Sequence, residues 1–156
     1  MLEREVRFVT TDVFTPEQRS AVMRRVRGRD TGPELAVRGI LRAAGIGYRL
    51  GGAGLPGRPD LVMKGRRVAV FVHGCFWHGH DCPRGSRKPK ANAAYWTAKI
   101  ERNRARDAAA HAALEAAGWR VVTVWECAMK APDFADRLVE EVRGQAAAVS
   151  TSASSA

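Results

Sequence analysis

His73-Gly-Cys-Phe-Trp-His-Gly-His-Asp-Cys82 is a ten-residue stretch that holds two of the chain's 3 cysteines and three of its 4 histidines. The remaining cysteine, Cys127, lies far along the chain, just after an apolar run. Phe76 and Trp77 stand between these potential metal ligands, where a tight loop has little core in which to bury large rings. The stretch predicts a metal-stabilised loop that presents aromatic side chains, which on a basic chain favours an action on nucleic acid.

The composition is that of a soluble globular protein with a basic excess. The 156 residues suffice for one domain, with 46% hydrophobic and 27% charged residues. No apolar run approaches the roughly 18 residues that cross a membrane, and the N-terminus lacks an apolar signal core. We therefore expect a cytoplasmic protein without membrane contact. The net charge of +10 favours a polyanionic partner, and 3 cysteines in a reducing compartment favour metal ligation over disulfides.

Periodicity divides the chain into an expected flexible arm over 1–15, a folded domain over 16–145 and a disordered tail over 146–156. Helix signals cover 16–27, Thr31 to Gly45, 92–117 and Asp133 to Gly144. Strand patterns cover 48–50, 60–64, 67–72 and 119–125. Strands interleaved with helices predict an α/β or α+β fold with helices packed on the faces of a sheet.

Two of the helices have a clear start and a clear apolar side. Thr31 should cap a helix that buries Leu35, Ile40 and Leu41. Asp133 should cap the last helix, whose inward side chains should be Phe134, Leu138 and Val142.

The cysteines suit a closed zinc site. Zinc with cysteine and histidine ligands takes four tetrahedral positions, which Cys75, His80, Cys82 and Cys127 would fill. Such a site is structural, because it leaves no position open for substrate. The spacing also allows His73 or His78 in place of His80, and three buried free cysteines remain the alternative.

The long helix carries an acid on its inward side. One stripe at spacings of three and four holds Trp96, Ile100, Asn103, Asp107, Ala110 and Leu114. The neighbouring Arg102, Arg104 and Arg106 suit a solvated or phosphate-facing side. A buried carboxylate needs a partner. Asp107 could orient a histidine for base catalysis, or form a salt bridge with an arginine, and spacing does not separate these alternatives.

Two further acids could serve a divalent cation. Asp60 follows Pro59 at the start of a hairpin of apolar strands, where its oxygen atoms could hold Mg²⁺. Two Mg²⁺ ions beside a phosphodiester can activate water and stabilise the leaving oxygen. Most such Pro-Asp pairs are only turns. Glu34 lies at the capping-box position after Thr31, a role that would by itself explain it.

Four runs in this order and spacing resemble the very-short-patch-repair (Vsr) DNA mismatch endonucleases: Leu55–Asp60, His73–His78, Gly118–Val121 and Val124–Cys127. The resemblance extends from about Thr15 to Met129. It implies a restriction-endonuclease-like core, with a mixed central β-sheet flanked by helices and one structural zinc. It also implies a monomer that nicks double-stranded DNA 5′ to the thymine of a T·G mismatch, formed when 5-methylcytosine deaminates. The activity would take place at the bacterial nucleoid. A repair polymerase and a ligase would follow, and other mismatch-repair proteins could be partners.

The resemblance also assigns roles to residues of this chain. Asp60 and the backbone carbonyl of Val72 would bind magnesium, with two Mg²⁺ ions expected. Glu34 would support the metal-bound waters, and His78, oriented by Asp107, would activate the attacking water. Zinc would be held by Cys75, His80, Cys82 and Cys127. Phe76, Trp77 and Met23 would wedge into the base stack, although Met23 could instead be core beside Val22 and Val26.

Three rival functions use the same features. A restriction-type endonuclease on this fold would cut both strands of paired DNA. A non-catalytic zinc-stabilised DNA-binding module would not need Asp60 or His78, and both are present. A zinc scaffold for another protein would not need the arginine-rich face.

Overall fold

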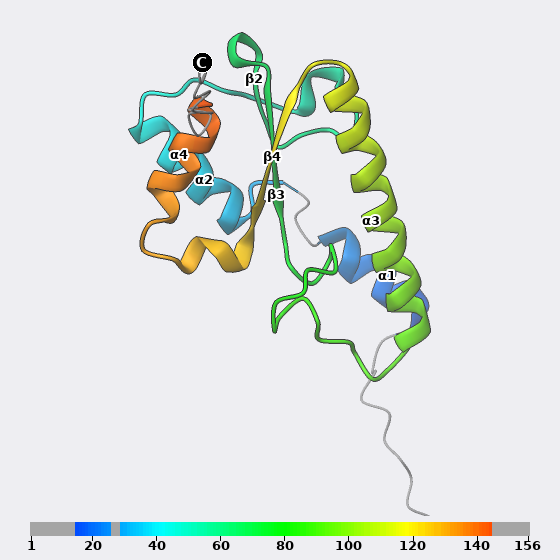
Figure 1. Cartoon of the computed structure of the whole chain (residues 1–156). Coiled ribbons are helices and arrows are strands. Elements are labelled where there is room, and N and C mark those ends of the chain that lie inside the picture. The colour runs from blue at the N-terminus through cyan, green and yellow to red at the C-terminus, as the bar shows by residue number, and fades with distance from the viewer. Residues whose placement is uncertain (1–14, 26–28, 145–156) are drawn as a thin grey trace, which may run out of the picture.

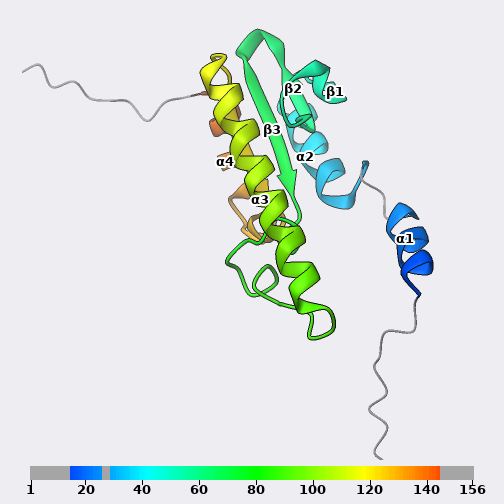
Figure 2. The same cartoon turned by 90° about the vertical axis from the view of Figure 1, so that its right-hand side faces the viewer.

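The computed structural model describes residues 15–25 and 29–144. Four β-strands form one sheet between two helical layers, with α2 and α4 on one face and α3 on the other (Figure 1). Seen after a quarter turn, α1 lies outside this sandwich (Figure 2). The main elements are α1 (Pro16–Arg25), α2 (Gly32–Ala43), β1 (Arg49–Leu50), β2 (Leu61–Met63), β3 (Val68–His73), α3 (Ala93–Ala116), β4 (Arg120–Trp125) and α4 (Phe134–Arg143). The expected mixed sheet flanked by helices is confirmed.

The sheet order β1-β2-β3-β4 combines two kinds of pairing. The pairs β1–β2 and β2–β3 are antiparallel, whereas β3 and β4 are parallel, with His73 opposite Trp125. A parallel pair needs a long crossover, and α3 supplies it on one face of the sheet. The carboxyl ends of β3 and β4 therefore meet at one edge, and the loops that follow them are brought together.

The core has one large and one small part. Helices α2 and α4 bury Val37, Leu41, Leu138 and Val142 against the sheet, each contributing roughly 1.5–3 kcal/mol as an upper estimate. The opposite face packs around Ala69, Phe71 and Leu114. The expected inward residues of α4 are confirmed. The expectation for Leu35 is wrong: it is 52% exposed, because the buried stripe follows Val37 and Leu41, and a residue two before Val37 points to the opposite side.

The helix starts confirm one expected cap and correct the other. The Thr31 hydroxyl accepts a hydrogen bond from the Glu34 N–H at 3.4 Å. Asp133 makes no side-chain cap on α4. Its carboxylate instead pairs with Arg137 Nε at 2.9 Å. Its backbone is not in the extended conformation that turns an N-cap side chain toward the first turn.

Helix α3 has the expected inward stripe. Ala110 and Leu114 are buried, while Trp96, Ile100, Asn103 and Asp107 are half-buried. Arg102, Arg104 and Arg106 are exposed. No helix in the described part of the chain combines the length and apolar character needed to cross a bilayer. Residues 1–14 of the expected arm and the expected tail lie outside the described residues.

Candidate active site and metal centre

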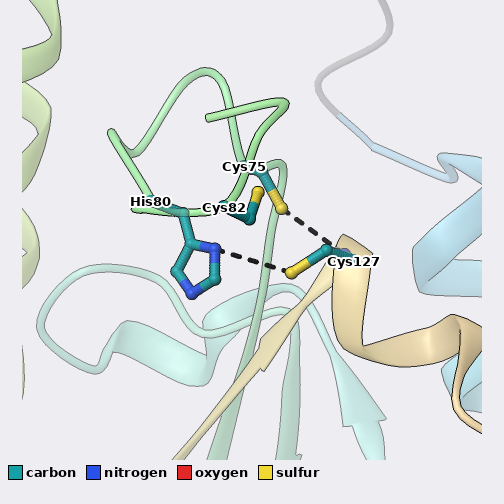
Figure 3. A group of neighbouring side chains, drawn as sticks. All are labelled: Cys75, His80, Cys82 and Cys127. Atoms are coloured by element: carbon teal, nitrogen blue, oxygen red, sulfur yellow. Dashed lines mark hydrogen bonds between the residues drawn. The ribbon is translucent and has the colours of Figure 1, made fainter. Parts of the chain in front are cut away.

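Three cysteines and one histidine converge where β3 and β4 end. Cys75 follows β3, Cys82 lies further along the same loop, and Cys127 lies in the 3₁₀ turn Glu126–Lys130 after β4. Their ligand atoms and one from His80 all lie within 4.8 Å of one another, and the four side chains point toward a common centre (Figure 3). Of the alternatives left by spacing, the structure brings His80 rather than His73 or His78 to the thiols.

The geometry of this group fits a tetrahedral metal ion. In a zinc site with the usual bond lengths, a sulfur and a nitrogen ligand lie about 3.6 Å apart. Here Cys127 Sγ and His80 Nδ1 are 3.5 Å apart. Two sulfurs also accept backbone hydrogen bonds, Cys75 from the Cys127 N–H at 3.4 Å and Cys82 from the Gly85 N–H at 3.3 Å. Such N–H donors stabilise thiolates, the form of cysteine that binds metal.

The pKa values of two of these thiols are shifted in opposite directions. Hydrogen bonds with His80 and the Gly85 N–H lower the pKa of Cys82 to about 6. Burial, together with the neighbouring Cys75 and Cys82, raises the pKa of Cys127 to about 11. One negative charge in this small space opposes a second. A dication at the centre would remove that opposition, so the donor set suits a metal ion.

Asp60 lies at the start of β2 and is held by the backbone of β3. Its N–H donates to the Val70 carbonyl at 2.9 Å, and its Oδ2 accepts from the Val72 N–H at 2.7 Å. No described residue donates a hydrogen bond to its Oδ1. Burial, only partly offset by the Val72 hydrogen bond, raises the pKa of Asp60, and the nearby Glu34 carboxylate raises it further.

Glu34 and Asp60 line one cavity of 510 Å³ together with arginines 29, 38 and 58. Glu34 is 6% exposed. It accepts from the Asp30 N–H at 3.0 Å and from Arg38 Nη2 at 3.3 Å. The structure thus gives Glu34 both predicted surroundings, because it supports the start of α2 and also faces the cavity that contains Asp60. Of the three carboxylates that line this cavity, Asp30 pairs with Arg38, whereas Asp60 has an oxygen that no described residue donates to. Glu34 and Asp60 together are therefore a suitable site for a hard cation.

His78 and Asp107 form the acid–imidazole pair that was one of two predicted alternatives. His78 Nδ1 lies 2.5 Å from Asp107 Oδ2. Gly79, at φ +61°, lets the loop approach α3 closely, since a Cβ there would lie 2.6 Å from Ile100 Cγ2. The glycine therefore allows His78 to reach the acid on the helix.

His73 stacks on His78, with ring centroids 3.8 Å apart and planes 1° from parallel. Burial and the neighbouring His78 lower the pKa of His73 to about 4, so this ring is neutral at physiological pH. A second cavity of 600 Å³ is lined by all four histidines, with Asp107, Arg104 and Trp125 among the other lining residues. Sequence reasoning missed His111 there. Its position, one turn after Asp107 on the same helix face, was the available signal.

Charged groups of one cavity interact with those of the other. The field of His78 reaches Asp60 and favours its charged form. Val72, whose carbonyl was a predicted metal ligand, donates its N–H to the Asp60 carboxylate, so its backbone lies beside that group. Asp60, Glu34, Val72, His78 and Asp107 are thus gathered at the same edge of the sheet.

The aromatic side chains of the loop are better packed than the sequence predicted. Phe76 and Trp77 are both half-buried, and each contacts Trp96 of α3, with ring centroids 5.6 and 5.9 Å apart. Lys99 Nζ lies 5.3 Å from the Trp77 ring. The expectation that these rings have little to pack against is wrong, because the first turn of α3 lies beside the loop. The side chain of Met23, the third predicted wedge, lies outside the described part of the structure.

The amino-acid sequence is similar to the proteins of one family. Residues 11–84 match the family model described as DNA mismatch endonuclease Vsr. The type II nicking enzyme V.XorIIP of Xanthomonas oryzae is 52% identical over 117 residues, covering 75% of this chain and 85% of the relative. V.NmeAIP of Neisseria meningitidis, also named a type II nicking enzyme, is 39% identical, covering 85% and 97%. The DNA mismatch endonuclease Vsr of Escherichia coli is 37% identical, covering 87% and 90%.

Proposed function

The chain belongs to the Vsr family of DNA mismatch endonucleases, and we propose that it nicks one strand of duplex DNA on the 5′ side of the thymine in a T·G mismatch, with Mg²⁺. The names of V.XorIIP and V.NmeAIP describe those relatives as nicking enzymes, which supports cleavage of one strand rather than two. The observation that carries the proposal is the convergence of Asp60, Glu34 and the His78–Asp107 pair at one edge of the sheet.

Asp60 would bind the catalytic cations together with the backbone carbonyl of Val72. Its Oδ1 has no donor among the described residues, and burial and the nearby Glu34 carboxylate disfavour its ionised form. A bound cation would stabilise the ionised carboxylate. When bound, Mg²⁺ supplies positive charge against the phosphate and the leaving oxygen. Glu34, fixed by Arg38 and the Asp30 N–H, would accept hydrogen bonds from water in the same cavity.

His78 would accept the proton of the attacking water. Asp107 accepts a hydrogen bond from Nδ1, which leaves the Nε2 lone pair as the basic site. The proton moves to Nε2, and Asp107 stabilises the imidazolium that forms. The parallel stack with neutral His73 holds the imidazole plane without adding a second positive charge.

The supporting parts of the proposal follow the same arrangement. Zinc would occupy the centre formed by Cys75, His80, Cys82 and Cys127 and join the loop after β3 to the turn after β4. The described core would be a restriction-endonuclease-like fold, part of a folded domain over 16–145 between an arm and a tail. Repair would be completed by a polymerase and a ligase.

Mismatch selection would come from wedging of Phe76, Trp77 and Met23 into the base stack. Inserting apolar side chains between bases costs a few kcal/mol per step. A mismatched step is already weakened, so the cost is lowest there. Packing on Trp96 supports the two rings from behind, which would reduce the entropy lost when they enter the duplex.

An incision assay tests the proposal. End-labelled duplexes carrying T·G, C·G or other mismatches, each in several flanking contexts, are incubated with zinc-loaded protein in Mg²⁺ or in EDTA. We expect one nick, 5′ to the mispaired thymine, in Mg²⁺ only. Cleavage of both strands of the paired C·G duplex would instead identify a restriction-type enzyme. Tight binding without cleavage in every context would identify a binding module.

A further inference from the structure

Arg58 has an unusual backbone conformation next to Asp60. It has φ +50°, the left-handed region that side chains with a Cβ rarely adopt. It closes a turn in which its N–H donates to the Leu55 carbonyl at 3.2 Å, with Gly57 at φ +74° before it. The residue after it is buried Pro59, and a following proline restricts the backbone further. Glycine would take this conformation at lower cost, so the arginine needs an explanation.

Packing does not supply that explanation. The backbones of Gly52 and Arg58 pass close to each other, since a Cβ on Gly52 would lie 2.8 Å from the Cα of Arg58. The Arg58 side chain itself is exposed. It makes no hydrogen bond or ion pair with any residue that the structure describes.

The other three non-glycine residues at positive φ among the described residues differ in this respect. The guanidinium of Arg67, at φ +53°, donates to the Ala117 carbonyl at 3.0 Å and lies 5.8 Å from the Trp119 ring. The Asp30 carboxylate pairs with Arg38. Asn92 also has a partner. Strain retained without a structural partner indicates a functional side chain.

The surroundings of Arg58 suggest its ligand. It lines the 510 Å³ cavity that also contains Asp60 and Glu34. Arg38, in the same cavity, is already engaged by Asp30 and Glu34. Arg58 forms no ion pair with any of the three acids that line the cavity, Asp30, Glu34 and Asp60, so its charge remains available. A guanidinium offers a planar pair of donors that matches two oxygens of a phosphate.

We propose that Arg58 is a catalytic residue that donates hydrogen bonds to a non-bridging oxygen of the scissile phosphate. This assignment rests on the proposed function, in which that phosphate lies between Asp60 and His78. Negative charge increases on that phosphate as the water attacks, so the guanidinium binds the transition state more strongly than the ground state. The turn sets the direction of the Arg58 Cα–Cβ bond, and the side chain lines the cavity that contains Asp60.

The test compares matched substitutions at two arginines that share the left-handed conformation. Arg58→Ala keeps the Cβ and the strain but removes the guanidinium, Arg58→Gly removes both, and Arg58→Lys keeps the charge without the planar fork. Arg67→Ala is the control, because it alters a partnered arginine outside the cavity. Single-turnover nicking of a T·G duplex in Mg²⁺ and the Kd for the same duplex in EDTA are measured on the full zinc-loaded chain, with the Tm as a check on folding.

We expect Arg58→Ala and Arg58→Gly to lower the single-turnover rate by about 10²–10³-fold, with a much smaller change in Kd. Arg58→Lys should retain part of the rate. Arg58→Gly should melt at or above the Tm of Arg58→Ala, and Arg67→Ala should lower the Tm while nicking at the wild-type rate.

Two results would overturn the assignment of Arg58 alone. The first is nicking at the wild-type rate by Arg58→Gly and by either Arg58→Ala or Arg58→Lys. The second is a loss confined to Kd, because this would place the Arg58 contact on a distant phosphate. If the wild-type chain nicks no T·G duplex, the proposed function fails and this assignment fails with it. The wild-type reaction therefore separates the two failures.

Discussion

Asp60 is a residue whose function opposes the stability of the fold. Burial and the Glu34 carboxylate raise its pKa above the ordinary 3.8, so the folded chain holds the proton more tightly than the unfolded chain does. Protonated Asp60 therefore favours folding at low pH. That contribution is lost as the pH rises through the raised pKa, and at neutral pH the ionised group destabilises the fold.

Asp60→Asn should consequently abolish nicking while raising the Tm at neutral pH. The amide oxygen can still accept from the Val72 N–H, and the opposed charge is gone. The gain should shrink as the pH falls toward 3.8, where wild-type Asp60 is itself protonated. Thermal denaturation across that pH range checks this, and Mg²⁺ should raise the Tm of the wild type only. A variant that melts below the wild type at neutral pH would contradict it.

Asp107→Asn should lower the nicking rate by about 10²–10⁴-fold, the usual contribution of a positioned general base. The asparagine amide can donate to His78 Nδ1, which favours the tautomer with its proton on Nε2 and so blocks the basic site. DNA affinity should change little. The control is Asp133→Asn, which alters an exposed acid whose partner is Arg137 on α4. Single-turnover nicking of both variants is the measurement, and equal rates would remove Asp107 from the mechanism.

At the scale of elements, the parallel pair β3–β4 brings distant parts of the chain to the candidate metal centre. Cys75 follows one strand and Cys127 follows the other, 52 positions further along the chain. The loop after β3 has no regular secondary structure until α3 begins at Ala93. Its shape thus depends on the ligands and on contacts with the first turns of α3. The same loop carries His78, so metal binding and the geometry of the proposed base are coupled.

Cys127→Ser should lower both the zinc content and the Tm, and with them the nicking activity, because structural zinc contributes directly to folding. Removal of zinc from the wild type by a strong chelator should reproduce the effect. Ser86→Ala is the control: it alters an exposed residue of the same loop, whose hydroxyl donates to the Pro83 carbonyl and to no other described residue. Metal analysis and calorimetry check the prediction, which an unchanged Tm and zinc content would contradict.

At the scale of the whole molecule, the net charge is +10, and arginines line both cavities. Arg104 lines the cavity of His78 and Asp107, on the exposed side of α3. Arg137 lies on α4, on the opposite face of the sheet (Figure 1). Phosphate contacts are therefore expected beside the two cavities and not on α4.

Arg104→Gln should weaken binding to matched and mismatched duplexes alike. It should also reduce the slope of log Kd against log salt concentration by about one, as expected when one phosphate contact is lost. Arg137→Gln should leave the slope unchanged. Titrations at several salt concentrations measure both, and equal slopes for the two variants would place Arg104 away from the DNA backbone.

Local patterns in the sequence predicted the helices and strands and drew attention to the cysteines, whereas the roles proposed for individual site residues came from the family resemblance. Helical spacing placed Asp107 and Leu114 on one stripe, Thr31 capped its helix as predicted, and cysteine content indicated the metal centre. These features depend on near neighbours in the chain, so the sequence carries them directly. Asp133 and Leu35 failed because a cap requires a particular backbone conformation, and burial depends on which side of α2 meets the sheet.

Only the tertiary structure decided which groups meet. Spacing left three histidines as possible zinc ligands and two possible partners for Asp107, and the folded loop brought His80 to the thiols and His78 to the acid. It also added His73 and His111 to the site, packed Phe76 and Trp77 on α3, and left Arg58 without a partner among the described residues. Such contacts join residues far apart in sequence, and they depend on how the sheet, the helix and the loop pack together, which local periodicity does not encode.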